Sequence, residues 1–298
     1  MPKIVVSGLV NTETTARVHG FPIEYFPIDY PFFGVNTAVS GVGCNLGKAL
    51  RTLGDEVSLL SMTGDDVTGR LIAQELRDVG ISDGDLQPCL SQTPNSVVLY
   101  DSTGRRQIYC DLKDIQETEY PFDEDMIADA DIVVACNINF NRPLLHMAKQ
   151  MGKTIATDVH VLFDVWDAYN REFMEAADIL FLSDEGVGRD YEPFLRALAR
   201  TYENRIIVLG RGAKGAAMYV RETDQIVELP AAHVGAVVNT VGAGDALFSS
   251  FLHYYAKGMD PVACLKRAQV FAAAKITVSG AAKGFITEEE VENLLTCL

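Results

Sequence analysis

The sequence predicts an α/β fold in which a mostly parallel central sheet is covered by helices. Short β-branched segments alternate with helical patterns along the whole chain, and this alternation is typical of parallel strands joined by crossover helices. The 298 residues are 48% apolar, enough for one large core. Although the length allows two domains of typical size, no linker, internal repeat or low-complexity segment divides the chain. We therefore expect a single α/β domain over residues 1–298.

Runs of β-branched and other apolar residues predict six strands. They lie at Ile4–Val6, Val57–Leu60, Ile132–Val134, Thr154–Ala156, Ile179–Phe181 and Ile206–Leu209. Apolar residues at helical spacing predict five helices among and after these strands. The helices lie at Asn45–Leu53, Asp66–Val79, Arg142–Met151, Glu192–Tyr202 and Ala246–Lys257.

Two segments interrupt this alternation. Residues 14–36 gather six aromatic residues among three prolines, a pattern typical of bent edge strands. The segment Ser96–Cys110 predicts a hairpin that turns near Gly104. Together they predict a small β sheet from about residues 12–38 and 94–112. Three roles for this small sheet remain open: a lid over a site, a dimer contact or a peripheral addition without a function of its own.

The charge of the chain excludes several classes of partner. Subtracting 41 Asp and Glu from 25 Lys and Arg gives a net charge of −16, and no run is rich in Lys or Arg. Such a surface repels a phosphate backbone and an anionic membrane, so we expect neither nucleic acid nor membrane partners. No apolar run reaches the roughly 18 residues that span a bilayer, and the first residues lack a secretory signal pattern. We expect a cytoplasmic protein.

The cysteines and histidines do not form a recognisable metal motif. The six cysteines include no Cys-x-x-Cys pair, and we expect them to be mostly reduced and buried. The five histidines are scattered, which excludes a zinc-binding His-Glu-x-x-His helix.

The segment Asn239–Asp245, Asn-Thr-Val-Gly-Ala-Gly-Asp, carries the strongest chemical signal. An apolar helical stripe follows it, so Gly242 and Gly244 lie where a helix begins. Glycines allow backbone conformations that turn successive N–H groups outward, and the helix dipole strengthens the resulting anion site. Asp245 then lies in the first turn, where we expect it to stay ionised and to deprotonate a hydroxyl that attacks a phosphoryl group. The alternative is a tight turn with a capping Asp.

Two other glycine clusters are weaker signals. Gly210–Gly215 matches Gly-x-Gly-x-x-Gly, but strand-like residues follow it instead of a helix, which argues against NAD. It lines a nucleotide or forms a plain hairpin. Ser40–Lys48 resembles a Walker A loop but is out of register. Its Gly41 and Gly43 allow close backbone approach before a helix, where Asn45 binds a polyhydroxyl ligand or caps the helix.

These clusters, in this order and spacing, resemble the PfkB (ribokinase-like) family of carbohydrate and nucleoside kinases over nearly the whole chain. The N-terminal family signature resembles Gly41-Val-Gly-Cys-Asn45 continuing to Gly54, and the C-terminal signature resembles Asn239–Asp245. The resemblance implies a three-layer α/β/α fold with a mostly parallel central sheet and a small β lid. It also implies an ATP- and Mg²⁺-dependent kinase of a small sugar or nucleoside, and a homodimer formed through the lid.

The resemblance also implies roles for individual residues. The catalytic set comprises Asp245 as the base and Gly242, Ala243 and Gly244 as the anion hole. The nucleotide set comprises Gly212, Gly215 and Thr240, with Gly280 and Ala281 beside the adenine. The acceptor set comprises Asn11 and Glu13, from Gly8-Leu-Val-Asn11-Thr-Glu13, together with Gly41, Gly43 and Asn45.

The chain departs from the family pattern at several positions. Glu13 replaces a shorter Asp, and Val42 stands where ribokinases carry Lys, so ribose itself is not expected. Ser183–Gly186 replaces the metal-organising Asn-x-x-Glu. Asp184 and Glu185 substitute for it, or Mg²⁺ is held mainly by nucleotide and water.

Asn239 replaces an Asp that lies near the monovalent ion in K⁺-activated members, which argues against monovalent activation. These departures leave open an inactive nucleotide- or sugar-binding regulatory protein. The intact Gly-Ala-Gly-Asp245 favours the enzyme.

Overall fold

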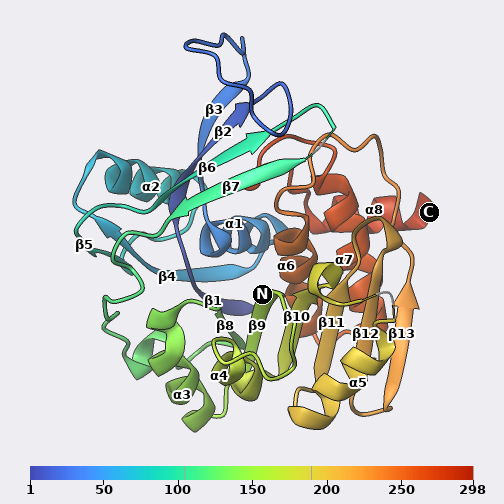
Figure 1. Cartoon of the computed structure of the whole chain (residues 1–298). Coiled ribbons are helices and arrows are strands. Elements are labelled where there is room, and N and C mark those ends of the chain that lie inside the picture. Colours follow the sequence, from blue (N-terminus) through green and yellow to red (C-terminus); the bar gives the residue numbers. More distant parts are fainter. Residues whose placement is uncertain (104, 189, 298) are drawn as a thin grey trace.

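The structure is a computed structural model that describes residues 1–103, 105–188 and 190–297. Within these residues the central element is a nine-stranded sheet with the order β13-β12-β11-β10-β9-β8-β1-β4-β5 (Figure 1). Its strands are β1 (Lys3–Ser7), β4 (Glu56–Gly64), β5 (Leu86–Leu90), β8 (Ile132–Ala135), β9 (Thr154–Val161), β10 (Ile179–Ser183), β11 (Ile206–Gly210), β12 (Ala216–Val220) and β13 (Gln225–Leu229).

The sheet is parallel from β5 to β11, as the sequence predicts. Ile4 of β1 pairs with Val57 of β4 on one side and with Ile132 of β8 on the other. Among the described strands of this sheet only β12 is reversed, and it pairs antiparallel with β11 on one side and with β13 on the other. All six predicted strands are present. The sequence did not reveal β5, because this edge strand is short and contains a proline.

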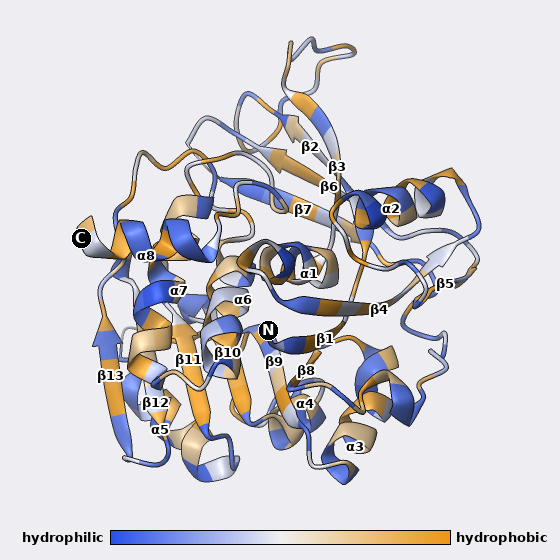
Figure 2. Cartoon of the chain, turned by 180° about the vertical axis from the view of Figure 1, so that it is seen from behind, coloured by the Kyte–Doolittle hydropathy of each residue, from blue (hydrophilic) through white to orange (hydrophobic). Residues whose placement is uncertain are grey.

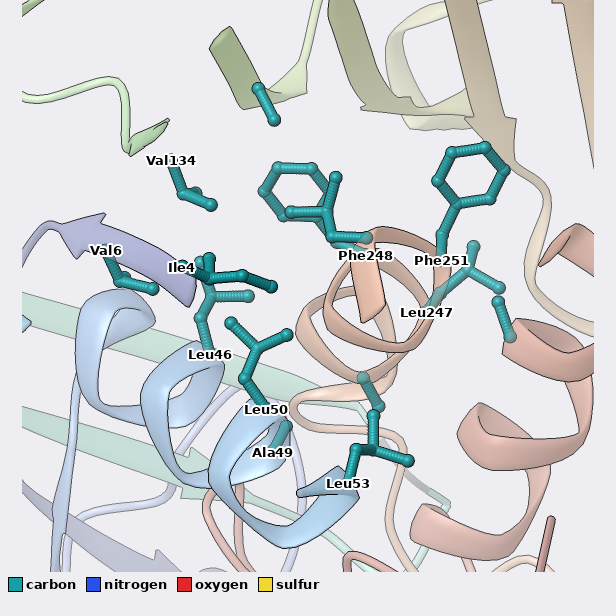
Figure 3. Packing of buried hydrophobic residues seen from close by; sticks show 14 of the residues in the cluster. Ile4, Val6, Leu46, Ala49, Leu50, Leu53, Val134, Leu247, Phe248 and Phe251 are labelled. Atoms are coloured by element: carbon teal, nitrogen blue, oxygen red, sulfur yellow. The ribbon is translucent and has the colours of Figure 1, made fainter. Parts of the chain in front are cut away.

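Helices pack on both faces of the sheet, which gives three layers. The helices are α1 (Val42–Leu53), α2 (Val67–Asp78), α3 (Arg142–Gln150), α4 (Arg171–Ala176), α5 (Glu192–Thr201), α6 (Ala243–Ala256), α7 (Pro261–Lys275) and α8 (Glu288–Cys297). One core joins the sheet to α1, α6 and α7, and a second joins it to α3, α4 and α5. Figure 3 shows Leu46 and Leu50 of α1 pointing into the same core as Ile4 of β1 and Phe248 of α6.

The buried strands have the continuous apolar sequence that two covered faces require. Figure 2 shows this as hydrophobic colour along β10 and β11. In β10, Phe181 packs against Phe248 of α6 with ring centroids 4.7 Å apart. The predicted three-layer α/β/α fold is confirmed.

Two predicted helices begin three residues earlier than expected. Helix α1 begins at Val42 instead of Asn45, and α6 begins at Ala243 instead of Ala246. Glycine has a low helix propensity, so Gly43 and Gly244 were placed before the helices although they lie within them. Helix α7 was not predicted, because buried residues surround it and leave no single apolar stripe. Helices α4 and α8 were also missed.

A second sheet stands beside the first, with the order β3-β2-β6-β7 (Figure 1). Its strands are β2 (Asn11–Arg17), β3 (Val35–Ser40), β6 (Asn95–Tyr100) and β7 (Arg106–Asp111). Strand β2 pairs antiparallel with β3 and parallel with β6, and β6 pairs antiparallel with β7. These strands fall within the segments 12–38 and 94–112, apart from the ends of β2 and β3. Gly104, where the hairpin turn was predicted, lies outside the described residues.

The aromatic-rich part of the predicted edge-strand segment, residues 14–36, is not a strand. Residues 18–34 form turns and irregular backbone, and their aromatic side chains are largely exposed. The predicted edge strands are therefore wrong over this part, because three prolines remove the N–H donors that a ladder needs.

The cysteine prediction holds for half of the residues. Cys44, Cys136 and Cys264 are buried, whereas Cys89, Cys110 and Cys297 are exposed. All six are free thiols. Within the described residues, no helix has the length and apolar character needed to cross a bilayer.

Candidate active site

Asp245 lies in the first turn of α6, the position that the sequence predicts. The helix begins after Gly242, whose φ of 79° is left-handed. A Cβ on Gly242 would lie 2.6 Å from the carbonyl oxygen of Ala281, so only glycine fits there without rearrangement. Gly244 does not share the left-handed conformation, contrary to prediction; it is an ordinary helical residue with open space around it.

The start of α6 presents free N–H groups. Ala243 N–H donates to the Thr240 carbonyl over 3.2 Å. Among the described residues, no hydrogen-bond acceptor is found for the N–H groups of Gly244 and Asp245. Unpaired N–H groups at a helix N-terminus combine with the helix dipole to attract an anion. The start of α6 is therefore a candidate anion hole, as the sequence predicts.

The carboxylate of Asp245 is held by a residue from a distant part of the chain. The side-chain amide of Asn45 donates to Asp245 Oδ2 over 2.7 Å. Burial raises the pKa of Asp245, while the Asn45 hydrogen bond and the nearby His160 lower it and Asp158 raises it further. The net pKa lies above the ordinary value of 3.8. Desolvation thus opposes the helix dipole, which the sequence predicts to favour the ionised carboxylate.

A cavity of about 490 Å³ opens beside Asp245. It lies at the carboxyl ends of β9, β10 and β11, where open α/β sheets bind their ligands. Its walls include these predicted residues: Gly212, Gly215, Thr240, Gly242, Ala243, Gly244, Asp245, Asp184 and Glu185. One cavity therefore joins the predicted nucleotide, catalytic and metal residues.

Gly280 and Ala281 are not part of this wall. Ala281 is buried and places its backbone against Gly242, so it shapes the anion hole from behind. Gly280 has a φ of 99° and makes the turn that leads into Ala281.

Two acidic residues lie at one end of the cavity. Asp184 and Glu185 form a short 3-10 helix directly after β10, and Lys214 approaches Asp184 to 3.8 Å. The described residues contain no group of three or more His, Cys, Asp or Glu that could enclose a metal. Mg²⁺ commonly takes one or two carboxylates and completes its shell with phosphate oxygens and water. Asp184 and Glu185 beside an open anion hole fit that mode of binding.

The predicted acceptor residues Asn11 and Glu13 lie on β2. They are two positions apart, so their side chains share one face of the small sheet. Asn11 is buried; its amide donates to Ser96 Oγ over 3.1 Å, and its Oδ1 has no partner among the described residues. Burial raises the pKa of Glu13, and so does the charge of Asp245; Lys275 and Arg106 lower it.

The other predicted acceptor residues, Gly41, Gly43 and Asn45, also have structural roles at the start of α1. A Cβ on Gly41 would lie 2.5 Å from the Leu9 carbonyl oxygen, and one on Gly43 would lie 2.8 Å from the Gly8 carbonyl carbon. These glycines let α1 pack backbone to backbone on the turn before β2. Asn45 is not the helix cap, and one of its two amide N–H groups is bonded to Asp245. The second N–H group has no hydrogen-bond acceptor among the described residues, so the role of Asn45 in acceptor binding stays a prediction.

Four residues that sequence reasoning missed also lie in or near this region. Asp158 and His160 line the cavity from the end of β9, and Arg106 lines it from β7. Lys275, at the end of α7, acts on both Asp245 and Glu13. The rule that ligands bind at the carboxyl ends of parallel strands could have found Asp158 and His160. No comparable signal marked Arg106 or Lys275.

Curated relatives resemble this chain over nearly their full length. The deoxyribokinase of Salmonella typhi is 25% identical over 309 residues, which cover 98% of each chain. The acarbose 7(IV)-phosphotransferase of Actinoplanes sp. is 25% identical over 287 residues, which cover 95% of each chain.

Solved structures share the fold. The microbiome-derived acarbose kinase Mak1 superposes with a TM-score of 0.86 at 24% identity and covers 99% of each chain. Ribokinase of Arabidopsis thaliana, complexed with ribose and ATP, superposes with a TM-score of 0.82 at 21% identity and covers 99% of this chain and 98% of its own. The pfkB family of carbohydrate kinases matches residues 1–288. The chain is a member of the PfkB carbohydrate kinase family.

Proposed function

We propose that this protein transfers the γ-phosphoryl group of ATP to a hydroxyl group of a small sugar, with Asp245 as general base. The observation that carries the proposal is the position of Asp245 in the first turn of α6, beside the unpaired N–H groups and the cavity. Phosphoryl transfer needs a positioned hydroxyl, a base beside it and donors for the developing charge. This region supplies a candidate for each.

Asp245 accepts the proton of the acceptor hydroxyl as its oxygen bonds to the γ-phosphorus. The bond from that phosphorus to the β,γ-bridging oxygen breaks, and ADP leaves with the electron pair. The N–H groups at the start of α6 stabilise the charge on the transferred group. The pKa of Asp245, raised by burial, makes it a better proton acceptor than an ordinary aspartate near neutral pH. Mg²⁺, held at Asp184 and Glu185, would neutralise phosphate charge.

The acceptor is held by β2. Asn11 offers an unpartnered Oδ1, and Glu13 offers a carboxylate on the same strand face. Acceptor groups in this arrangement suit the donor O–H groups of a polyhydroxylated ligand. The two curated relatives described above are named as a deoxyribokinase and an acarbose phosphotransferase, and a less similar one is named as a nucleoside kinase. The names favour a sugar, and a nucleoside is the alternative acceptor.

ADP release from ATP and Mg²⁺ across a panel of sugars, sugar acids and nucleosides tests the proposal. We expect release that depends on a sugar acceptor. The Glu13→Gln variant should raise the KM for that sugar and leave the KM for ATP nearly unchanged. Glu24→Gln, which removes an exposed carboxylate from the 18–34 segment, is the matched control. Silence across the panel, with calorimetric binding of ATP or a sugar, would instead identify a non-catalytic binding protein.

We also propose that two copies associate through the small sheet. Three of its side chains, Val35, Val97 and Tyr109, are more than a third exposed. The strand register places all three on one face of the sheet, opposite the face that carries Glu13. Such a row of exposed, largely apolar side chains is typical of an interaction surface. Light scattering should give a dimer for the natural chain and a monomer for Val97→Asp. A monomeric natural chain at micromolar concentration would refute the association.

A further inference from the structure

Lys275 is a completely buried lysine directly behind the anion hole. It is the last residue of α7 and has no exposed side-chain surface. Its Nζ donates to the carbonyl oxygen of Val241 over 2.5 Å. The next residue, Ile276, accepts hydrogen bonds at its carbonyl from the N–H groups of Val238 and Asn239, over 2.8 and 3.1 Å. The end of α7 is thus tied to the segment that leads into Asp245.

A buried ammonium group is costly unless its charge is used. Desolvation lowers the pKa of Lys275 to about 8, while Asp245 and Glu13 counteract the shift. An apolar side chain such as Met would fill the same volume without this cost. The charge therefore has a role beyond packing, and its surroundings indicate what that role is.

The hydrogen bond to Val241 fixes the direction of one peptide group. In a planar trans peptide, the C=O and the following N–H point in opposite directions. Since the Val241 carbonyl points at Lys275, the Gly242 N–H points away from Lys275. Asn239 Oδ1 accepts from the Val241 N–H over 2.8 Å and restrains the preceding peptide too. Lys275 and Asn239 together set the orientation of the backbone where the anion hole begins.

The same groups do not suit an inorganic monovalent cation. The family pattern has a carboxylate at position 239 near such an ion, but this chain has the neutral Asn239, whose Oδ1 is already bonded to Val241. The Val241 carbonyl is bonded to an ammonium group. The ammonium group of Lys275, which is part of the chain itself, therefore already supplies a positive charge next to this backbone segment.

We propose that the Lys275 ammonium is a built-in monovalent cation that positions the Val241–Gly242 peptide of the anion hole, so that the enzyme needs no K⁺. This inference rests on the proposed kinase activity. Lys275 is a positioning residue, because it is buried and bonded to backbone instead of lining the cavity. It acts on the transferred group only through the backbone that it orients.

The test compares ADP release in K⁺, in Na⁺ and in tetramethylammonium for four proteins. The natural chain should turn over equally in all three salts. Lys275→Ala should lose about 10- to 100-fold in kcat, less than the roughly 100-fold or greater loss for a removed oxyanion donor, because the N–H group is displaced and not deleted. It should recover activity in K⁺ or ammonium. Lys275→Gln, which keeps a donor but no charge, should stay impaired and gain nothing from either cation. Lys48→Met is the control, because Lys48 is buried but bonds Glu75 on α2.

A second readout separates this inference from the proposed function. K⁺ or ammonium should raise the Tm of Lys275→Ala above its value in tetramethylammonium, and should leave the Tm of the natural chain and of Lys48→Met unchanged. Activation of the natural chain by K⁺, full kcat in Lys275→Gln, or the absence of any cation-specific rescue would overturn the inference. If no acceptor yields ADP, the proposed function fails, and the Tm comparison alone decides whether Lys275 fills a cation site.

Discussion

Asn45 and Asp245, which are 200 positions apart in the sequence, are joined by a hydrogen bond of 2.7 Å from amide to carboxylate. Asn45 lies on the first turns of α1, and Asp245 lies on the first turn of α6. Two helix starts that each follow a glycine are thereby locked together. The bond leaves the other carboxylate oxygen, Oδ1, free of protein donors among the described residues. That oxygen is the one we assign to proton transfer.

Replacing Asn45 with Ala should shift the pH dependence of turnover. The Asn45 amide lowers the pKa of Asp245, so its loss should raise that pKa. The base must be ionised, and the acidic limb of kcat/KM should move to higher pH. We also expect a roughly 10- to 100-fold lower kcat from lost orientation. An unmoved acidic limb, with Thr52→Ala of the same helix as control, would contradict this role.

Gly242→Ala should damage catalysis more than stability. The new Cβ would meet the Ala281 carbonyl oxygen at 2.6 Å and would force the anion hole to move. Loss of one oxyanion donor lowers kcat about 100-fold or more. The control is Gly258→Ala, because Gly258 has a similar φ of 77° but no atom within 4 Å of its Cβ. Both variants should lose about 1–2 kcal/mol of unfolding free energy from left-handed strain, and Gly242→Ala should lose more because its Cβ also clashes with Ala281. Equal activities in the two variants would remove Gly242 from the anion hole.

Asp184→Asn and Glu185→Gln should each weaken the response to Mg²⁺. Both carboxylates line the cavity, and Mg²⁺ binds through one or two carboxylates plus phosphate and water. We expect a higher Mg²⁺ concentration for half-maximal ADP release at fixed ATP. Glu203→Gln, which changes a carboxylate away from the cavity, should behave like the natural chain. Unchanged Mg²⁺ titrations for both cavity variants would show that nucleotide and water suffice.

Asp245→Asn should be more stable than the natural chain at neutral pH. A carboxyl group whose folded-state pKa is raised above its ordinary 3.8 binds its proton more tightly when folded. Its contribution to stability is therefore greatest at low pH and is lost as the pH rises through the folded-state pKa. The neutral Asn avoids the cost of the buried charge. Denaturant unfolding at pH 7 compares the free energies of unfolding of the two proteins. A lower value for Asp245→Asn would mean that the Asp245 carboxylate stabilises the folded state.

The sequence predicted the sheet well because periodicity is local information. The β-branched runs and their alternation with helices predict six strands and their parallel arrangement. The two segments that interrupt this alternation predict the small second sheet. Residues 18–34 were misassigned because aromatic side chains favour strands in general, while the prolines decide the local outcome. Helix α7 was missed because a helix buried on all sides has no apolar stripe.

The candidate site was predicted in part. The anion hole and its aspartate are contiguous in sequence, so the string Gly242–Asp245 was enough to find them. Asn45 was identified, but its hydrogen bond to Asp245 was not, since only the folded chain brings α1 against α6. Lys275 gave no signal, because a lysine at a helix end is normally exposed. Contacts between distant segments were the part that local patterns could not supply.

The most direct measurement is the single-turnover rate of ADP formation by Asp245→Asn, at saturating ATP, Mg²⁺ and the best sugar of the panel. If Asp245 is the general base, this rate should fall by about 2–4 orders of magnitude, while calorimetry shows ATP binding nearly unchanged. A rate within a few fold of the natural chain, with ATP bound equally well, would contradict the role of Asp245 in catalysis.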